Sequence, residues 1–438
     1  MIADALASTL QAALIGRHPG PLCVAYSGGP DSTALLHALA ALPEARARGL
    51  RAVHVDHGLH ADSARWAAHC RAFAALLQVP LAVIRVEVPL GRGEGLEAAA
   101  RDARYAAFAT ELRDGETLVL AQHRDDQAET VLLKLLRGAG PEGLGGMRAE
   151  RAFARGRLWR PLLALPRAAL ADYVRAHALA CIEDPANADP ALARSYLRRE
   201  ILPRLARHWP QAPQAIAHAA TLCREAAAHI AHEADAARAR LRGAEPATLD
   251  AAGWAALSPA LRTPVLEGWL HGLGLPAPTR AQAAELLRQV ETSAGDRVPR
   301  VAWPGVEMRL WRGLLYAMAP LPEVPSDWRA RWDGTPLALP ARGGVLALEV
   351  DAPERLDAPL EVRIGVAGAR LKPAGDRHTR ALRDLYQQAG IPPWRRTRCP
   401  LIYTADGVLL AVADLWRSDA GAALFERLAA RPRWTPAC

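Results

Sequence analysis

The chain has 438 residues, 51% hydrophobic and 23% charged, which fits about two to three packed domains and excludes an intrinsically disordered protein. Its formal net charge of +8 and its isoelectric point near 9.5 favour a polyanionic partner such as a nucleic acid. With no C-x-x-C pair, no basic signal-peptide region and no bilayer-length apolar run, we expect a cytoplasmic protein without a zinc ribbon or a membrane partner.

Strands and helices are predicted to alternate over the first part of the chain. After an amphipathic helix at 2–15, strands are expected at 22–26, 50–59, 81–88 and 117–121, with helices at 62–78, 94–113 and 125–137. This alternation predicts an α/β fold with a doubly wound parallel sheet, in which ligands bind at the carboxyl ends of the strands. Polar clusters follow three of these strands, at 27–32, 56–57 and 122–126.

The pattern changes after Pro166. Helices are predicted at 167–208 around a break at 184–187, and then at 212–242 and 256–290, before a β-like stretch at 301–311. Proline-rich residues 320–340 indicate a linker, and short strands, a helix at 378–389 and a hairpin at 400–412 follow it. We therefore predict three domains: 1–208, a mainly helical 209–320, and a small α+β domain at 340–438.

The segment Ser27-Gly28-Gly29-Pro30-Asp31-Ser32 joins the first predicted strand to the next helix. Its glycines let the backbone approach a ligand closely, and the free N–H groups of the helix start favour an anion such as phosphate. The spacing is neither G-x-x-x-x-G-K-[ST] nor G-x-G-x-x-G. It resembles the pyrophosphate loop of the N-type ATP pyrophosphatases, which split ATP between the α and β phosphates. The alternative is an ordinary serine-glycine turn with a capping aspartate.

An acidic cluster follows the fourth predicted strand. Asp126 and Glu129 are three residues apart at a helix start, so they share a face and suit a cationic guest, either a metal ion or an amine. The alternative for the preceding Asp125 is a helix-capping acid.

Arginines and glycines stand out in four further places. Arg101 and Arg104 share one side of a helix and match phosphate oxygens, although a solvated helix face is the alternative. Arg194 and Arg198 on one helix, and Arg395 and Arg396 beside Trp394, suit an RNA backbone, with the same alternative. The glycine-dense segment 136–147 fits a mobile lid, a close substrate contact or a flexible connection.

These motifs, taken in order, resemble the tRNA(Ile)-lysidine synthase family. The stretches that carry the resemblance are 27–32, 53–59, 100–105, 123–130, 136–147, 160–163 and 183–187, together with 382–400 near the carboxyl end. The similarity is thinner between residues 210 and 360. Within the motifs, Ser195 and Asp56 stand where the family often has Asn, and Gln122 stands where a second His is common.

The resemblance implies a reaction in which ATP adenylates the wobble cytidine of a CAU-anticodon isoleucine tRNA, and free L-lysine then displaces AMP. It implies nucleotide binding by Ser27, Gly28, Gly29, Pro30, Asp31, Ser32, His54 and Asp56, with Asp31 acting through Mg²⁺. By the same carry-over Arg104 faces the phosphates, and Asp126 and Glu129 bind the lysine ammonium. The tRNA is expected to contact Arg194 and Arg198 of the catalytic domain, and Arg395 and Arg396 of the carboxyl-terminal domain. The helical domain 209–320 is also expected to contact the tRNA. A homodimer is compatible with the family.

Three rival functions remain open at this point. A tRNA thiolase also adenylates a base oxygen, but many such enzymes need the paired cysteines that this sequence lacks. A small-molecule synthetase with the same loop fits poorly with the basic carboxyl-terminal region. A tRNA-binding protein with a degenerate ATP fold fits poorly with the intact loop and the acidic pair.

Overall fold

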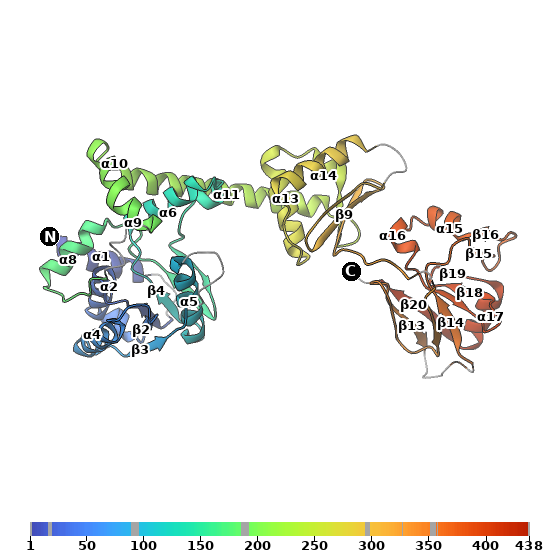
Figure 1. Cartoon of the computed structure of the whole chain (residues 1–438), viewed down its shortest axis with the longest axis horizontal. Coiled ribbons are helices and arrows are strands. Elements are labelled where there is room, and N and C mark those ends of the chain that lie inside the picture. Colours follow the sequence, from blue (N-terminus) through green and yellow to red (C-terminus); the bar gives the residue numbers. More distant parts are fainter. Residues whose placement is uncertain are drawn as a thin grey trace. The chain divides into compact units, whose positions relative to one another are not determined.

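The computed structural model describes residues 2–15, 20–88, 96–184, 192–293, 298–325, 327–350, 356 and 358–436. Within it the chain divides into two compact units, residues 1–229 and 230–438 (Figure 1). The division falls inside α11 (Ala212–Leu241), whereas the sequence predicts a first domain that ends before this helix, at residue 208. No helix among the described residues is long and apolar enough to span a membrane.

The first unit is built on a six-stranded sheet with the order β3-β2-β1-β4-β6-β5. Its strands are β1 (Leu22–Ala25), β2 (Arg51–Asp56), β3 (Leu81–Arg85), β4 (Thr117–Val119), β5 (Glu150–Phe153) and β6 (Gly156–Trp159). All neighbours pair in parallel except β5 with β6. The predicted doubly wound parallel sheet is confirmed, and the β5–β6 hairpin is an addition that the sequence patterns did not indicate.

Helices cover both faces of this sheet (Figure 1). The helices of this unit up to residue 176 are α1 (Ile2–Leu14), α2 (Pro30–Ala40), α3 (Pro43–Ala47), α4 (Ser63–Leu76), α5 (Leu96–Glu111), α6 (Arg124–Leu136), α7 (Pro141–Leu144) and α8 (Arg167–Ala176). Because successive strand residues point to opposite faces, Leu22 and Val24 of β1 pack with α1, α2 and α8, while Cys23 packs with α5. The core of the first unit therefore lies in two layers around β1.

A helical segment at residues 193–208, called the helical rod below, contains a π-helical turn. It contains α9 (Ala193–Tyr196), a π-helical turn (Leu197–Ile201) and α10 (Leu202–His208). Pro203, in the first turn of α10, has no N–H to donate to the preceding turn, which is a physical reason for the helix to widen there. The break predicted at 184–187 lies outside the described residues from position 185 onward.

The strand order reverses between β1 and β4. The chain leaves β1 toward β2 and β3 and then returns to place β4 on the other side of β1. In open α/β sheets the segments that follow two such strands diverge and leave room for a ligand at the carboxyl edge. The segments after β1 and β4 are the glycine loop and the acidic cluster, so the fold brings both to this point.

The described residues of the second unit form four more sheets. The first has the order β7-β10-β9-β8 and lies with α12 (Ala251–Ala255), α13 (Pro259–Gly272) and α14 (Arg280–Thr292); its strands are β7 (Thr248–Asp250), β8 (Arg300–Trp303), β9 (Val306–Trp311) and β10 (Leu314–Met318). The β-like stretch expected at 301–311 is thus two antiparallel strands of a sheet. The sequence pattern led us to expect a mainly helical segment here, and the structure adds this sheet to it.

The carboxyl-terminal part begins earlier than the sequence suggests. β11 (Arg329–Trp332) pairs with β14 (Leu360–Arg363), and β12 (Leu337–Leu339) pairs with β13 (Gly344–Val350), so these parts of the predicted linker 320–340 belong to sheets. The remaining elements are β15 (Arg370–Leu371), β16 (Arg380–Ala381), α15 (Leu382–Gln388), α16 (Pro393–Arg396), β17 (Leu401–Tyr403), β18 (Leu409–Val412), β19 (Trp416–Arg417), α17 (Asp419–Arg427) and β20 (Ala430–Thr435). The predicted α+β character and the hairpin of β17 and β18 are confirmed.

Candidate active site

The glycine loop turns sharply after β1 and is held from behind. Gly28 has φ +82°, a conformation that favours glycine, and a Cβ built there would lie 2.3 Å from Cδ1 of Ile182 and 3.0 Å from Sγ of Cys70. The carbonyl of Gly28 accepts a hydrogen bond of 2.8 Å from the backbone N–H of Ile182. The loop therefore requires glycine here, for conformation and for space.

Hydroxyl and N–H groups gather at the start of α2. The Oγ atoms of Ser27 and Ser32 are 3.0 Å apart, and the N–H of Gly29 donates to Ser27 Oγ at 3.4 Å. Gly29 is the N-cap of α2 and supplies no side-chain cap, so the first N–H groups of this helix face the loop without one. This is the geometry that binds a phosphate group at a helix N-terminus.

The two candidates on β2 support this loop in different ways. His54 is buried, and its Nδ1 atom lies 2.9 Å from the carbonyl oxygen of Tyr26, the residue before the loop. Burial lowers the pKa of His54, which keeps the ring neutral and able to donate to that carbonyl. Asp56 accepts a hydrogen bond of 2.9 Å from the N–H of Gly58 in the turn after β2. Direct contact of either residue with a nucleotide stays a prediction.

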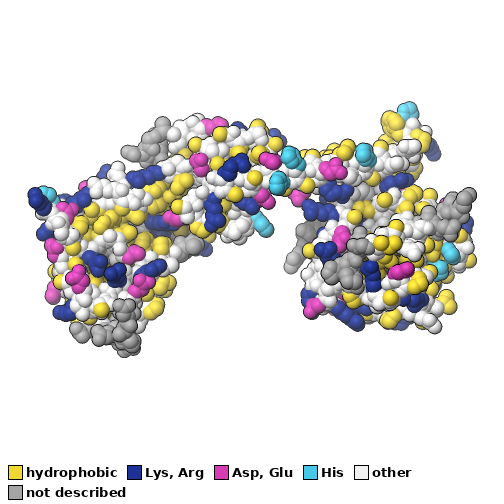
Figure 2. All heavy atoms as spheres, turned by 180° about the vertical axis from the view of Figure 1, so that it is seen from behind, with side chains coloured by type: hydrophobic (Ala, Val, Ile, Leu, Met, Phe, Trp, Pro, Cys, Tyr) yellow, Lys and Arg dark blue, Asp and Glu magenta, His cyan; other side chains and the backbone are white. Residues whose placement is uncertain are grey.

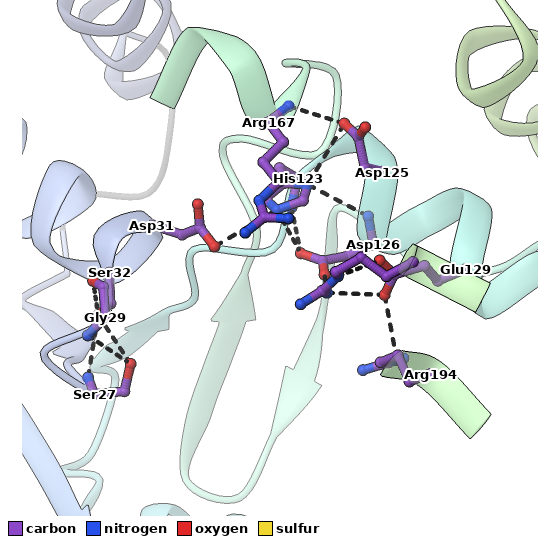
Figure 3. Close-up of polar contacts among 11 residues, drawn as sticks. Ser27, Gly29, Asp31, Ser32, His123, Asp125, Asp126, Glu129, Arg167 and Arg194 are labelled. Atoms are coloured by element: carbon purple, nitrogen blue, oxygen red, sulfur yellow. Dashed lines mark hydrogen bonds and ion pairs between the residues drawn. The ribbon is translucent and has the colours of Figure 1, made fainter. Parts of the chain in front are cut away.

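His123 connects the loop to the acidic cluster (Figure 3). This buried residue is the N-cap of α6, and its Nε2 atom lies 3.6 Å from Asp31 and 3.4 Å from Asp126. Burial alone would lower the pKa of His123, but the hydrogen bond to Asp31 and the charges of Asp126 and Asp125 raise it. The loop and the acidic cluster thus face one another across a single histidine.

The three carboxylates of the acidic cluster differ in their partners. Asp125 accepts a hydrogen bond of 2.8 Å from the backbone N–H of Arg167, the first residue of α8 (Figure 3). The alternative that Asp125 caps its own helix is wrong, because the N-cap of α6 is His123. Glu129 is fully buried, and Arg198 donates to its two oxygens at 2.6 and 2.9 Å. Asp126 receives one bond of 3.0 Å from Arg198 and keeps a partly exposed side chain.

The predicted basic residues of the first unit reach the site in two ways. Arg198 and Arg194 come from the helical rod, and Arg194 lies 3.7 Å from Glu129 and donates to Thr130 at 3.0 Å. Arg104 on α5 donates from Nε to Nε2 of His57 at 3.2 Å. Burial and the Arg104 cation lower the pKa of His57 to about 4, and its buried Nδ1 atom has no partner among the described residues. A neutral ring whose Nε2 accepts must carry its proton on this Nδ1.

The predicted basic residues of the second unit make intramolecular contacts. Arg395 donates to Glu245 at 2.8 Å, and Arg396 donates from Nε to the carbonyl of Ile391 at 2.8 Å. Basic side chains are exposed on both units on the face shown in Figure 2. A tRNA contact by any of the four predicted arginines remains a prediction.

Three residues that the motif analysis gave no role lie at the carboxyl edge of the sheet. They are His57, His123 and Arg160, all of them inside quoted motifs, but sequence spacing alone did not show what they contact. Arg160 is buried after β6 and donates to the Gln122 side chain at 2.9 Å and to the carbonyl of Arg148 at 2.8 Å. Within the described part of the chain no carboxylate forms an ion pair with it, so it adds uncompensated positive charge to this edge.

The described residues contain no cluster of three or more His, Cys, Asp or Glu side chains that could hold a metal ion. Asp31, in the first turn of α2, is one-third exposed and its carboxylate faces His123. A single carboxylate with substrate phosphates and water is a donor set that Mg²⁺ accepts, since this ion rarely uses a cage made only of protein. The residues therefore fit a magnesium ion that arrives with the nucleotide.

Comparison with known sequences places these features in one family. A PP-loop domain profile matches residues 3–205, a TilS substrate binding domain profile matches 249–316, and a TilS substrate C-terminal domain profile matches 360–434. The tRNA(Ile)-lysidine synthase of Xanthomonas campestris pv. campestris (strain 8004) is 45% identical over 90% of this chain and 91% of its own. That of Alkalilimnicola ehrlichii is 42% identical over 95% of this chain and 93% of its own.

Among solved structures, the U34-tRNA thiolase NcsA from Methanococcus maripaludis is a more distant likeness, with a TM-score of 0.42 and 15% identity over 51% of this chain and 80% of its own. The curated relatives, in contrast, match nearly end to end. The chain belongs to the tRNA(Ile)-lysidine synthase family.

Proposed function

We propose that this protein adenylates the wobble cytidine of a CAU-anticodon isoleucine tRNA and joins free L-lysine to it, with release of pyrophosphate and AMP. The observation that carries the proposal is the position of His123, 3.6 Å from Asp31 of the loop and 3.4 Å from Asp126 of the acidic pair. A phosphate-binding loop and a cation-binding pair on opposite sides of one histidine suit two substrates of opposite charge.

In the first step the C2 oxygen of cytidine attacks the α-phosphorus of ATP, and the bond to the β-phosphate oxygen breaks. The N–H groups of α2 and the hydroxyls of Ser27 and Ser32 would hold the phosphates. Arg104 would stabilise the charge of the departing pyrophosphate. A magnesium ion bound by Asp31 would neutralise part of the charge on the phosphates.

In the second step the uncharged amine of lysine attacks C2, AMP leaves with the oxygen, and a nearby carboxylate takes the amine proton. Asp126 has the more exposed side chain of the acidic pair, 14% against 1% for Glu129, so we assign it the direct contact with the ammonium group. Glu129 is buried and engaged by Arg198, and it contributes by holding that arginine. Among the described residues Nη1 of Arg198 has no hydrogen-bond partner, which leaves it for the lysine carboxylate.

The basic composition and the two substrate-binding domains support a tRNA substrate, and the family relatives favour lysine over the sulfur chemistry of a thiolase. We expect the reaction in the cytoplasm, where tRNA, ATP and free lysine occur together. A homodimer stays a prediction for gel filtration to test.

The proposal is tested with purified enzyme, labelled ATP and a CAU-anticodon isoleucine tRNA transcript, with and without lysine. We expect lysine-dependent AMP release and a wobble nucleoside whose mass equals cytidine plus lysine minus water. A methionine tRNA with the same anticodon serves as the control and should give neither product. AMP release that needs no tRNA would show a small-molecule synthetase instead, and tRNA binding without any ATP cleavage would show a degenerate ATP fold.

A further inference from the structure

The glycine-dense segment after α6 is held in place at its end. It contains α7 (Pro141–Leu144), and the backbone of Gly145, Gly146 and Met147 then lies against two other helices. Gly146 has φ +67°, and a Cβ built there would lie 2.7 Å from Nε2 of Gln127. A Cβ on Gly145 would lie 3.1 Å from Cβ of Arg224. The glycines here allow close approach to two side chains, which a flexible connection would not require.

Gln127 attaches this segment to α6. Its side chain is 2% exposed and stands next to Asp126 in the sequence. The amide bonds Met147 in both directions: Met147 N–H donates to Oε1 at 2.7 Å, and Nε2 donates to the Met147 carbonyl at 3.1 Å. Because a buried amide must keep its partners, sliding α6 past the segment would break both bonds at once.

Arg224 attaches the same segment to α11. Its Nη1 group donates to the carbonyls of Met147 at 2.9 Å and of Gly145 at 3.2 Å, and Nη2 donates to Thr221 at 3.1 Å. In the described part of the chain no carboxylate forms an ion pair with this guanidinium. Arg224 therefore holds the segment through directional hydrogen bonds to two backbone carbonyls, and not through an ion pair.

We propose that Gln127 and Arg224 are positioning residues for the lysine site. They fix α6 along its axis, and with it Asp126 and Glu129, relative to the helix that leads into the second unit. A slip of one residue along a helix moves a side chain by about 1.5 Å, and a misplacement of about 1 Å can cost a hundredfold in rate. Arg224 lies outside both neighbouring family profiles, which end at 205 and begin at 249, so it is a connector residue with a role in the site. This inference rests on the proposed lysine-binding function.

The test uses the full-length enzyme with Arg224→Met, Gln127→Met, the double variant and Arg224→Lys. The matched control is Arg175→Met, which changes an exposed arginine of α8 that pairs with Asp172. Each single change to Met should raise the KM for lysine about tenfold and leave the KM for ATP within about twofold. The double variant should be no worse than either single one, because both residues act on one backbone segment. Arg224→Lys should restore part of the loss, since an ammonium can still donate to the two carbonyls.

Three results would overturn the inference: effects that add in the double variant, equal rises in the KM for ATP and for lysine, or a lowered melting temperature with unchanged kinetic constants. If Arg224→Met does not fold, the comparison of Arg224→Lys with wild type decides, because it should still raise the lysine KM. A wild-type enzyme that shows no lysine-dependent product would instead contradict the proposed function, so the two failures are distinguishable.

Discussion

At the scale of single residues, His123 holds the site together. Its Nδ1 atom accepts from the N–H of Asp126 at 3.3 Å, which leaves Nε2 to face Asp31 and the Asp126 carboxylate. The buried ring thus carries a proton toward the space between the loop and the acidic pair. Sequence motifs brought Asp31 and Asp126 forward as separate clusters, and the histidine explains why they face each other.

Replacing Asp31 by Asn should abolish pyrophosphate release while tRNA binding survives. The carboxylate is the only acidic side chain in the loop motif, and its loss removes the proposed magnesium ligand without adding bulk. The measurement is pyrophosphate release with saturating tRNA, together with a filter-binding assay for tRNA. Normal turnover by this variant would show that the loop does not hold the nucleotide.

Replacing Asp126 by Asn should chiefly raise the KM for lysine, by about tenfold or more, because a charged hydrogen bond to the ammonium is worth about 1.5–3 kcal/mol. The KM for ATP should stay near the wild-type value. Steady-state kinetics with lysine and ATP varied in turn provide the measurement. An unchanged lysine KM with depressed ATP use would reassign the acidic pair to a metal ion.

At the scale of secondary structure, a buried ion pair joins two strands at the amino-terminal edge of the parallel sheet, opposite the edge that carries the candidate active site. Arg51 at the start of β2 donates to Glu116, just before β4, at 2.6 and 2.7 Å, and to Glu111 at 2.8 Å. Both Arg51 and Glu116 are buried. The pair spans β1, which lies between β2 and β4 and carries the glycine loop at its other end.

Replacing Glu116 by Gln should lower the free energy of unfolding by about 3 kcal/mol, because it leaves Arg51 with less compensating charge in a buried place. Burial would raise the pKa of Glu116, but the hydrogen bonds and charge of Arg51 lower it below its ordinary value. Its contribution is therefore complete above the ordinary carboxyl pKa and is lost as pH falls through the folded-state pKa. Denaturation curves at neutral and acidic pH should show a smaller acid effect in the variant, and an equal one would contradict this role.

Sequence periodicity predicted the strands that are apolar and largely buried, such as β1 and β2. It did not predict β5 and β6, because arginines interrupt the apolar pattern between Glu150 and Trp159 and β5 is the edge strand of the sheet. It also took β11 and β12 for linker, since prolines dominate that stretch and the pairing partners lie further along the chain. The bonds of Arg198 to Glu129 join residues 69 positions apart, and no local pattern reveals such contacts.

At the scale of the whole molecule, an aromatic cluster joins the two substrate-binding domains within the second unit. Trp394 is buried, with its ring centroid 4.9 Å from that of Tyr316 and 6.3 Å from that of Trp311. The neighbouring Arg395 forms an ion pair with Glu245. The turn that carries Trp394 and Arg395 thus connects the carboxyl-terminal domain to the preceding domain, and to Glu245 just before that domain.

Replacing Trp394 by Ala should raise the KM for tRNA several-fold and leave the KM values for ATP and lysine unchanged, because removal of a buried Trp costs about 3–5 kcal/mol of packing. The control is Trp209→Ala, whose side chain is 59% exposed in the first unit. Equal effects of both substitutions on the tRNA KM would contradict a specific role for the cluster.

The central claim is that one edge of a parallel sheet activates an RNA oxygen beside a bound amino acid. The most direct measurement omits lysine and analyses the tRNA by mass spectrometry after incubation with enzyme, ATP and Mg²⁺. We predict an isoleucine tRNA that carries one adenylyl group at the wobble cytidine, which added lysine converts to product with AMP release. The account would be contradicted if the tRNA stayed unmodified in the reaction without lysine and the reaction with lysine produced an adenylyl group on lysine itself.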